Sequence, residues 1–134
     1  MGAVIDSNVF IYAAVEDLEH HRSAMNIIRS LDRWIVPTVV VYETVWNFRK
    51  LGFSTVEARE LIEQILFDSR ASLVDDRQYL LEGFKLLQSL SLAHYNDSVI
   101  LAVAKDVGAL ATYDKRLRNR AEKVGIKLLP EVVE

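Results

Sequence analysis

Hydrophobic residues occur along the chain in two alternating patterns: short continuous runs, and longer stretches in which they recur every three or four positions. Short runs are typical of strands buried on both faces, and the three-and-four spacing is typical of helices with one apolar side. Because one or two helical stretches separate successive runs, the strands are expected to lie parallel. The runs predict strands at residues 3–5, 34–36, 71–74, 109–112 and 126–129.

The helical stretches carry residues that favour helix starts and stops. Ser54 and Glu57 have the spacing of a capping box, and Gly108 stands where a helix stops. The predicted N-caps of three other helices are Ser7 or Asn8, Thr38 and Asn96. The predicted helices cover residues 9–15, 21–31, 38–51, 55–66, 79–90, 97–107 and 114–124. The pattern as a whole predicts an α/β protein, a single three-layer α/β/α domain over residues 1–134 with a parallel sheet of four to five strands.

The composition narrows the chemistry that the protein can use. The sequence contains no cysteine, so disulfides and thiolate metal sites are excluded. No apolar run approaches the roughly 20 residues of a membrane span. The N-terminus lacks the charged and apolar regions of a signal peptide. We therefore expect a cytoplasmic protein without a membrane partner.

The net charge of −3 argues against nucleic acid as a partner, but the charges are unevenly distributed. Five of the nine residues from 115 to 123 are positive, and only Glu122 opposes them. Two interpretations remain open, a solvated helix face and a patch that contacts phosphates. The five positive residues are Lys115, Arg116, Arg118, Arg120 and Lys123.

Four acidic residues stand where the predicted fold would bring them together. Asp6 follows the first strand, Asp114 lies two residues past the fourth, and Asp97 lies in the first turn of a helix. The carboxyl ends of parallel strands meet at one edge of a sheet, where ligands collect. Glu43 lies within a helix. Each acid alone also has a structural explanation, as a helix cap, a dipole partner or the partner of a nearby polar side chain.

Four converging carboxylates are costly unless their charge is compensated. Two ionised carboxylates about 4 Å apart repel by about 4 kcal/mol at an effective dielectric constant near 20. Raised pKa values or a bound cation would relieve this repulsion, and oxygen ligands suit Mg²⁺ or Mn²⁺ rather than zinc. The histidines lack the spacing of a zinc site, and we expect all three to be structural or solvated: His20, His21 and His94.

A hard cation held by carboxylates most often serves phosphoryl chemistry, because it polarises a phosphate and lowers the pKa of a bound water. Asn8 and Thr112 could position a water or a phosphate oxygen beside the acids. Lys115 and Arg116 could neutralise phosphates of a chain that runs past them. The sequence has neither a glycine-rich phosphate loop nor a serine nucleophile elbow, which disfavours nucleoside triphosphatases and acyl transferases.

In their order and spacing, these residues resemble the PIN domain, and most closely the VapC-like toxin ribonucleases of prokaryotes. The matching segments are residues 4–9, 37–43, 97–104 and 110–114, and the resemblance spans essentially the entire chain. It implies a metal-dependent endoribonuclease that cleaves RNA with Mg²⁺ or Mn²⁺. The implied catalytic residues and metal ligands are Asp6, Glu43, Asp97 and Asp114, with Asn8 and Thr112 in supporting positions.

The resemblance also implies contacts with RNA and with other proteins. The expected RNA phosphate contacts are Lys115, Arg116 and Arg118. Many VapC-like proteins are homodimers inhibited by a small antitoxin protein that inserts an arginine into the acidic pocket, so both partners are expected here. Leu117 departs from the family pattern, which often has an aromatic residue there, and this affects packing rather than chemistry. Four aromatic residues suit either such interfaces or the core, and the core is favoured: Trp34, Trp46, Phe48 and Phe53.

The sequence disfavours three alternatives to a ribonuclease. A non-catalytic PIN-like scaffold that binds RNA or protein is disfavoured because all four acids are present. A phosphorylation-receiver domain is disfavoured because Asp6 has no acidic neighbour and the pair Asp75 and Asp76 comes too late in the chain. A phosphatase of the haloacid-dehalogenase type would need a second aspartate where Asn8 stands.

Overall fold

The computed structural model describes residues 1–134 and has a sheet of five parallel strands at its centre. Along the sheet the strands follow the order β3-β2-β1-β4-β5, so that the first strand of the chain is the central one. The predicted α/β class and parallel sheet are confirmed, with five strands. The strands are β1 (Gly2–Ile5), β2 (Arg33–Pro37), β3 (Ala71–Val74), β4 (Ala109–Ala111) and β5 (Lys127–Leu129).

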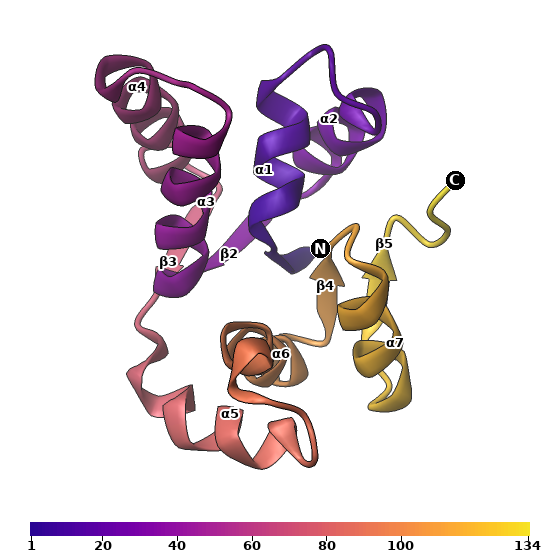
Figure 1. The fold of residues 1–134 in the computed structure, drawn as a ribbon. Helices are drawn as coiled ribbons and strands as arrows, with labels where there is room; N and C mark the ends of the chain where they lie inside the picture. Colours follow the sequence, from indigo (N-terminus) through magenta and orange to yellow (C-terminus); the bar gives the residue numbers. More distant parts are fainter.

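Seven α-helices cover the sheet in two groups, which gives three layers. In Figure 1, α1–α4 occupy the upper part of the view and α5–α7 the lower part, with the strands passing between them. None of the seven has the length and apolar character that crossing a bilayer requires. The helices are α1 (Ser7–Ala14), α2 (His21–Ser30), α3 (Thr38–Lys50), α4 (Thr55–Leu66), α5 (Leu80–Leu87), α6 (Tyr95–Val107) and α7 (Lys115–Lys123).

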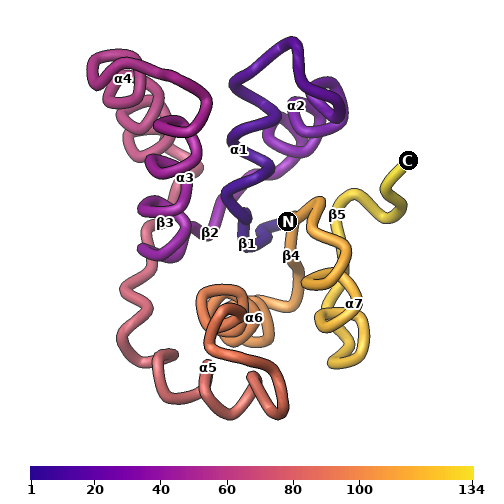
Figure 2. Tube along the Cα trace, viewed as in Figure 1, coloured from indigo at the N-terminus to yellow at the C-terminus, as the bar shows by residue number.

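The core is built around β1. Its residues 3–5 have no exposed surface, and Val4 pairs with Ile35 of β2 and Leu110 of β4. α6 packs against this strand, and its residues 98–104 are all buried. Figure 2 traces the chain from its N-terminus near the centre of the sheet to its C-terminus beyond β5. Because helices cover both faces, the strands carry continuous apolar runs, and this is why the runs predicted them.

The starts of α1 and α3 differ from the prediction. Asp6, rather than Ser7 or Asn8, is the N-cap of α1, and its side chain accepts a hydrogen bond from the Ser7 amide at 2.8 Å. Thr38 is the first residue of α3 rather than its cap. The reason is a tertiary contact, since the Thr38 hydroxyl donates a hydrogen bond to the Val74 carbonyl of β3 at 3.0 Å.

Two 3₁₀ turns, residues 76–79 and 92–94, were not predicted. The first precedes α5, which ends at Leu87 rather than at the predicted residue 90, because Gln88 has a positive φ of 54°. The second leads directly into α6, which therefore begins at Tyr95 and contains Asn96. Gly108 ends α6 as predicted, in the left-handed conformation (φ 97°) that glycine adopts without strain. The predicted capping box at the start of α4 is also confirmed.

The four aromatic residues that suited either the core or an interface divide between the two environments. Trp34 and Phe48 are buried, as the favoured interpretation predicted, and Phe53 stacks on Phe48. Trp46 differs, because 54% of its surface is exposed on α3. Trp46 has the nearby Arg49 guanidinium over its ring at 4.8 Å, which is a cation–π contact.

α5 and α6 approach each other most closely at Gly83. A Cβ atom at this position would lie 2.9 Å from Val99 Cγ2 and 3.2 Å from a ring carbon of Tyr95. Val99 is itself buried and tightly packed. The absence of a side chain at residue 83 therefore sets the distance between these two helices.

We predict that Gly83→Ala lowers the free energy of unfolding by about 1–3 kcal/mol, because overpacking outweighs the higher helix propensity of alanine. Urea denaturation measures this change. Leu81→Ala is the control, because Leu81 lies on the same helix and is 77% exposed, so its effect should stay within about 0.5 kcal/mol. A Gly83→Ala protein as stable as the wild type would show that the close approach is not required.

Candidate active site

Asp6 lies directly after the central strand β1 and is almost completely buried, with 4% of its surface exposed. Its Oδ1 accepts a hydrogen bond from the Ser7 amide at 2.8 Å, and its Oδ2 accepts one from the Thr112 hydroxyl at 2.7 Å. Thr112 directly follows the neighbouring strand β4. The ends of two adjacent strands thus hold this carboxylate at the edge of the sheet where ligands bind in open parallel sheets.

Asn8 and Thr112 link the ends of β1 and β4 around this carboxylate. Asn8 Nδ2 lies 3.4 Å from Asp6 Oδ2 and 3.3 Å from Thr112 Oγ1. The side-chain oxygen of Asn8 accepts a hydrogen bond from the Tyr113 amide at 3.1 Å. The Thr112 hydroxyl oxygen accepts one from the Asp114 amide, also at 3.1 Å. The structure therefore places both predicted supporting residues against Asp6.

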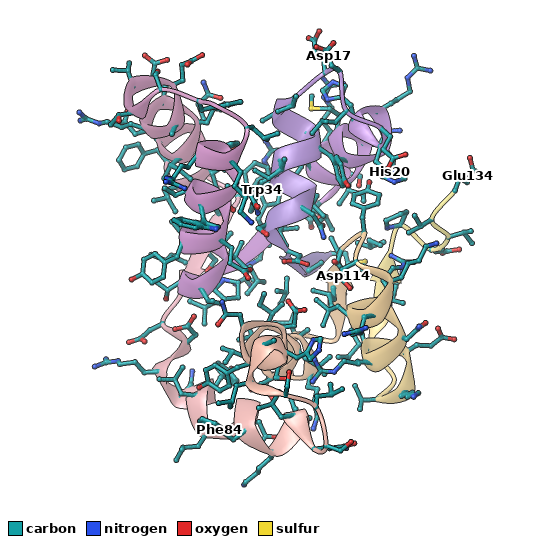
Figure 3. The ribbon with its side chains drawn as sticks, viewed as in Figure 1. Asp17, His20, Trp34, Phe84, Asp114 and Glu134 are labelled. Atoms are coloured by element: carbon teal, nitrogen blue, oxygen red, sulfur yellow. The ribbon has the colours of Figure 1, made fainter.

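The other three acids come from three helices. Asp114 is the exposed N-cap of α7, and its Oδ1 accepts a hydrogen bond from the Leu117 amide at 2.9 Å. Figure 3 shows it between β4 and α7, in the middle of the view. Asp97 lies in the first turn of α6, and Glu43 lies within α3, both partly buried. Asn96, which was predicted to cap α6, lies inside the helix, and its side chain lowers the pKa of Glu43.

Burial and neighbouring negative charges raise the pKa values of three of the four acids. Burial, and then the charges of Asp97 and Asp114, raise the pKa of Asp6 to about 6, although hydrogen bonds oppose the rise. Burial raises the pKa of Glu43 to about 7, and the charges of all three aspartates contribute. Burial and the charge of Asp114 also raise the pKa of Asp97. The charges of the four acids predicted from the sequence thus act on one another in the folded protein.

Two side chains beside Asp97 were not predicted for the site, Arg120 of α7 and His94 of the preceding turn. Together with Arg116, they lower the pKa of Asp97 and partly offset the rise caused by burial. His94 Nε2 lies 2.9 Å from Arg116 Nη1. The four-residue spacing of Arg116 and Arg120 places them on one helix face, and this was the signal in the sequence that could have identified Arg120.

Arg118, which was predicted to contact RNA phosphates, is not accessible for such a contact. It is buried (8% exposed), and its guanidinium donates hydrogen bonds to the carbonyls of Thr112 at 2.8 Å, of Pro130 and of Glu131 at 3.0 Å. These hydrogen bonds join the C-terminal segment to the end of β4. Charge alone could not separate it from its neighbours on α7, of which Lys115 and Arg116 are exposed.

A protein-family model described as the PIN domain matches residues 3–123. The chain belongs to the PIN domain family. PIN domains are generally nucleases, and PIN nucleases generally use divalent metal ions. A comparison with curated protein sequences found no match.

Solved structures share the fold of this PIN domain along nearly its full length. VapC20 of Mycobacterium tuberculosis, described as a sarcin-ricin loop cleaving toxin, is 14% identical with a TM-score of 0.76, covering 98% of this chain and 99% of that one. VapBC2 of Rickettsia felis, solved bound to a DNA fragment from their promoter, is 15% identical with a TM-score of 0.65, covering 96% and 97%. The PIN domain endonuclease Utp24 is 19% identical with a TM-score of 0.56, covering 95% and 82%.

Asp6, Glu43, Asp97 and Asp114, which we call the acidic cluster, offer only carboxylate oxygens as metal ligands. Such ligands suit a hard divalent cation. No three carboxylate or imidazole groups in the structure are arranged to hold an ion between them. Mg²⁺ usually keeps several waters and binds through one or two carboxylates together with substrate phosphates. The cluster therefore fits a largely hydrated ion rather than a cation enclosed by protein ligands.

The raised pKa of Asp6 makes the stability of the PIN domain depend on pH when no divalent ion is present. The folded pKa, about 6, lies above the ordinary value of 3.8. The protonated carboxyl therefore favours the folded state below about pH 4, and this contribution is lost as the pH rises through about 6. We predict that Asp6→Asn removes this dependence and raises the free energy of unfolding at pH 7 by about 1–3 kcal/mol.

Urea denaturation in EDTA between pH 4 and 8 measures the effect. Asp17→Asn is the matched control, since Asp17 is exposed and Figure 3 shows it at the top of the view, away from Asp114. Parallel stability profiles of the wild type and Asp6→Asn would contradict the origin assigned to the pH dependence.

Proposed function

We propose that this PIN domain, acting as one unit over residues 1–134, is an endoribonuclease that needs Mg²⁺ or Mn²⁺ to cleave RNA phosphodiester bonds. The observation that carries the proposal is the buried Asp6 carboxylate at the ends of β1 and β4, together with the raised pKa values of Asp6, Glu43 and Asp97. Buried acids that repel one another have an excess of negative charge, and a divalent cation would relieve it. The proposed catalytic residues are Asp6, Glu43, Asp97 and Asp114, which would hold the ion directly or through bound water.

When bound, the cation would polarise the scissile phosphate and lower the pKa of the attacking water. The protein's own groups supply position and charge. Asp6 is held in one orientation by the hydrogen bonds from Ser7 and Thr112, so little reorganisation is needed when the substrate arrives. Asn8 can orient a phosphate oxygen or water beside it. Lys115, exposed next to Asp114, can neutralise a phosphate of the RNA, and Arg116 can do the same.

We further propose that the protein is the toxin of a VapBC-type toxin–antitoxin pair and acts in the cytoplasm as a homodimer restrained by a small antitoxin protein. The likeness in fold to VapC20 and to VapBC2 supports this assignment. Exposed apolar side chains on two helices supply surface for protein partners, Tyr42, Val45 and Trp46 on α3 and Leu81 and Phe84 on α5.

A non-catalytic PIN scaffold in RNA processing is the second candidate. The observation that favours it is that no three acidic or imidazole groups form a ready metal site. The two candidates differ in what Mn²⁺ does. An enzyme binds the ion through the acidic cluster and cleaves RNA, whereas a scaffold needs neither step.

We predict that the wild type cleaves RNA in the presence of Mn²⁺, and that Asp6→Asn lowers the rate by about 100-fold or more, because the cation loses a ligand. Gel analysis of a panel of RNAs measures cleavage, and calorimetry measures Mn²⁺ binding. Asp17→Asn should match the wild type in both. Intact RNA together with Mn²⁺ binding that does not depend on Asp6 would favour the scaffold instead.

Thr112 offers a test that leaves every acid in place. Its hydroxyl lowers the pKa of Asp6 by donating a hydrogen bond to the carboxylate. We predict that Thr112→Val moves the pH of half-maximal cleavage upward by about 0.5–1 unit, since one hydrogen bond contributes about 1 kcal/mol. Thr112→Ser keeps the hydroxyl and should behave as the wild type does. Equal pH profiles for the two variants would show that the hydrogen bond does not tune Asp6.

A further inference from the structure

α7 has a basic face, of which the proposed mechanism uses only Arg116. Four of its residues recur at spacings of three and four and so lie on one side of the helix. This side borders the loop between α5 and the following 3₁₀ turn, and the two enclose a groove of about 600 Å³. The groove is lined by Arg116, Asn119, Arg120 and Lys123 on α7, with Gln88 and Ser89 opposite them. We refer to it as the α7 groove.

The α7 groove has a positive lining, and the negative charge nearest to it is that of Asp97, which acts on Arg116 and Arg120 from the neighbouring helix. No acidic residue lines it, and none of its three cations takes part in any of the protein's ion pairs. Elsewhere the chain does neutralise exposed arginines, as with Arg59 and Arg77, each of which is paired with a carboxylate. A protein with a net charge of −3 thus keeps a groove without negative charge, and such a groove attracts anions.

The two arginines in the groove are held in fixed orientations. Arg120 Nη2 donates hydrogen bonds to the Leu86 carbonyl at 2.9 Å and to Ser98 Oγ at 2.6 Å. Both bonds come from one nitrogen, so the Nε and Nη1 hydrogens have no partner within the protein. Arg116 is held by His94 at 2.9 Å. A guanidinium oriented in this way is suited to binding the oxygens of a phosphate.

The α7 groove begins beside the acidic cluster. Ser98, which Arg120 contacts, directly follows Asp97 in the chain, and Arg116 lies two residues beyond Asp114. From Arg116 to Lys123 the helix rises by about 10 Å. A strand whose scissile phosphate lies at the acids therefore has a row of cations for the phosphates on one side of the cut.

We propose that the α7 groove binds the backbone phosphates of the RNA substrate on one side of the scissile bond, through Arg116, Arg120 and Lys123. The choice of RNA rests on the proposed function, whereas the preference for an anionic chain rests on the groove itself. Lys123 carries the sharpest test, because its side chain is exposed, makes no hydrogen bond and forms no ion pair. Its replacement is not expected to disturb folding.

The experiment measures binding of a fluorescein-labelled single-stranded RNA oligonucleotide by fluorescence anisotropy over a range of salt concentrations. EDTA is present to prevent cleavage. Each phosphate contact contributes about 0.7 to the slope of log K against log salt for a single strand. Lys123→Gln should lower the slope by about this amount and weaken binding several-fold at low salt. Lys50→Gln makes the same charge change on α3, at a distance from the groove (Figure 1), and should leave both values unchanged.

The outcomes separate the groove from the proposed function. The proposal for the α7 groove is overturned if the wild type does not bind RNA, or if Lys123→Gln and Lys50→Gln have the same slope. Either result overturns it even if the protein cleaves RNA with Mn²⁺. A lower slope for Lys123→Gln alone supports the groove, and it does so even if no cleavage is found, in which case only the proposed enzyme activity fails.

Discussion

The buried contact between the Asp6 carboxylate and the Thr112 hydroxyl, 2.7 Å long, is the interaction on which the candidate site depends. A charged group taken out of water needs hydrogen bonds, and these come from the ends of the two central strands. Because β1 and β4 are adjacent and parallel, their ends deliver both partners to the same place. The remaining acids are then added by helices that start or pass beside this point. The sheet thus determines where the chemistry is located.

The cost of this arrangement is electrostatic. Burial and mutual repulsion raise the pKa values of Asp6 to about 6 and of Glu43 to about 7, so the folded protein without a cation is less stable than an uncharged equivalent would be. Enzymes commonly accept such instability at the site that performs the reaction. Here the same instability favours the binding of positive charge, because a cation or a neighbouring positive side chain reduces the repulsion between the carboxylates. Arg120 and Arg116 already do so for Asp97.

Much of the fold and of the acidic cluster could be predicted from the sequence. The continuous apolar runs marked the strands, of which the three central ones are largely buried and the edge strands β3 and β5 are partly exposed. The strand ends located Asp6 and Asp114. The details that depend on three-dimensional contacts were missed. Thr38 bonds to β3 instead of capping its helix, and the turn at residues 92–94 shifts the start of α6. Arg118 and Arg120 of α7 carry the same charge, so the sequence could not distinguish them. Arg118 bonds to the C-terminal segment, whereas Arg120 faces the α7 groove.

The pairing of Ile5 with Ala111 places Asp6 and Thr112 directly after matching positions on neighbouring strands. In a sheet, a shift of one residue turns a side chain from one face to the other. A slipped alignment of these two strands would therefore leave the Asp6 carboxylate buried without its hydroxyl partner. The same contact that prepares the site for its ligand thus penalises misaligned forms of the sheet during folding. Insertions or deletions within either strand should consequently be rarer than changes in the loops around them.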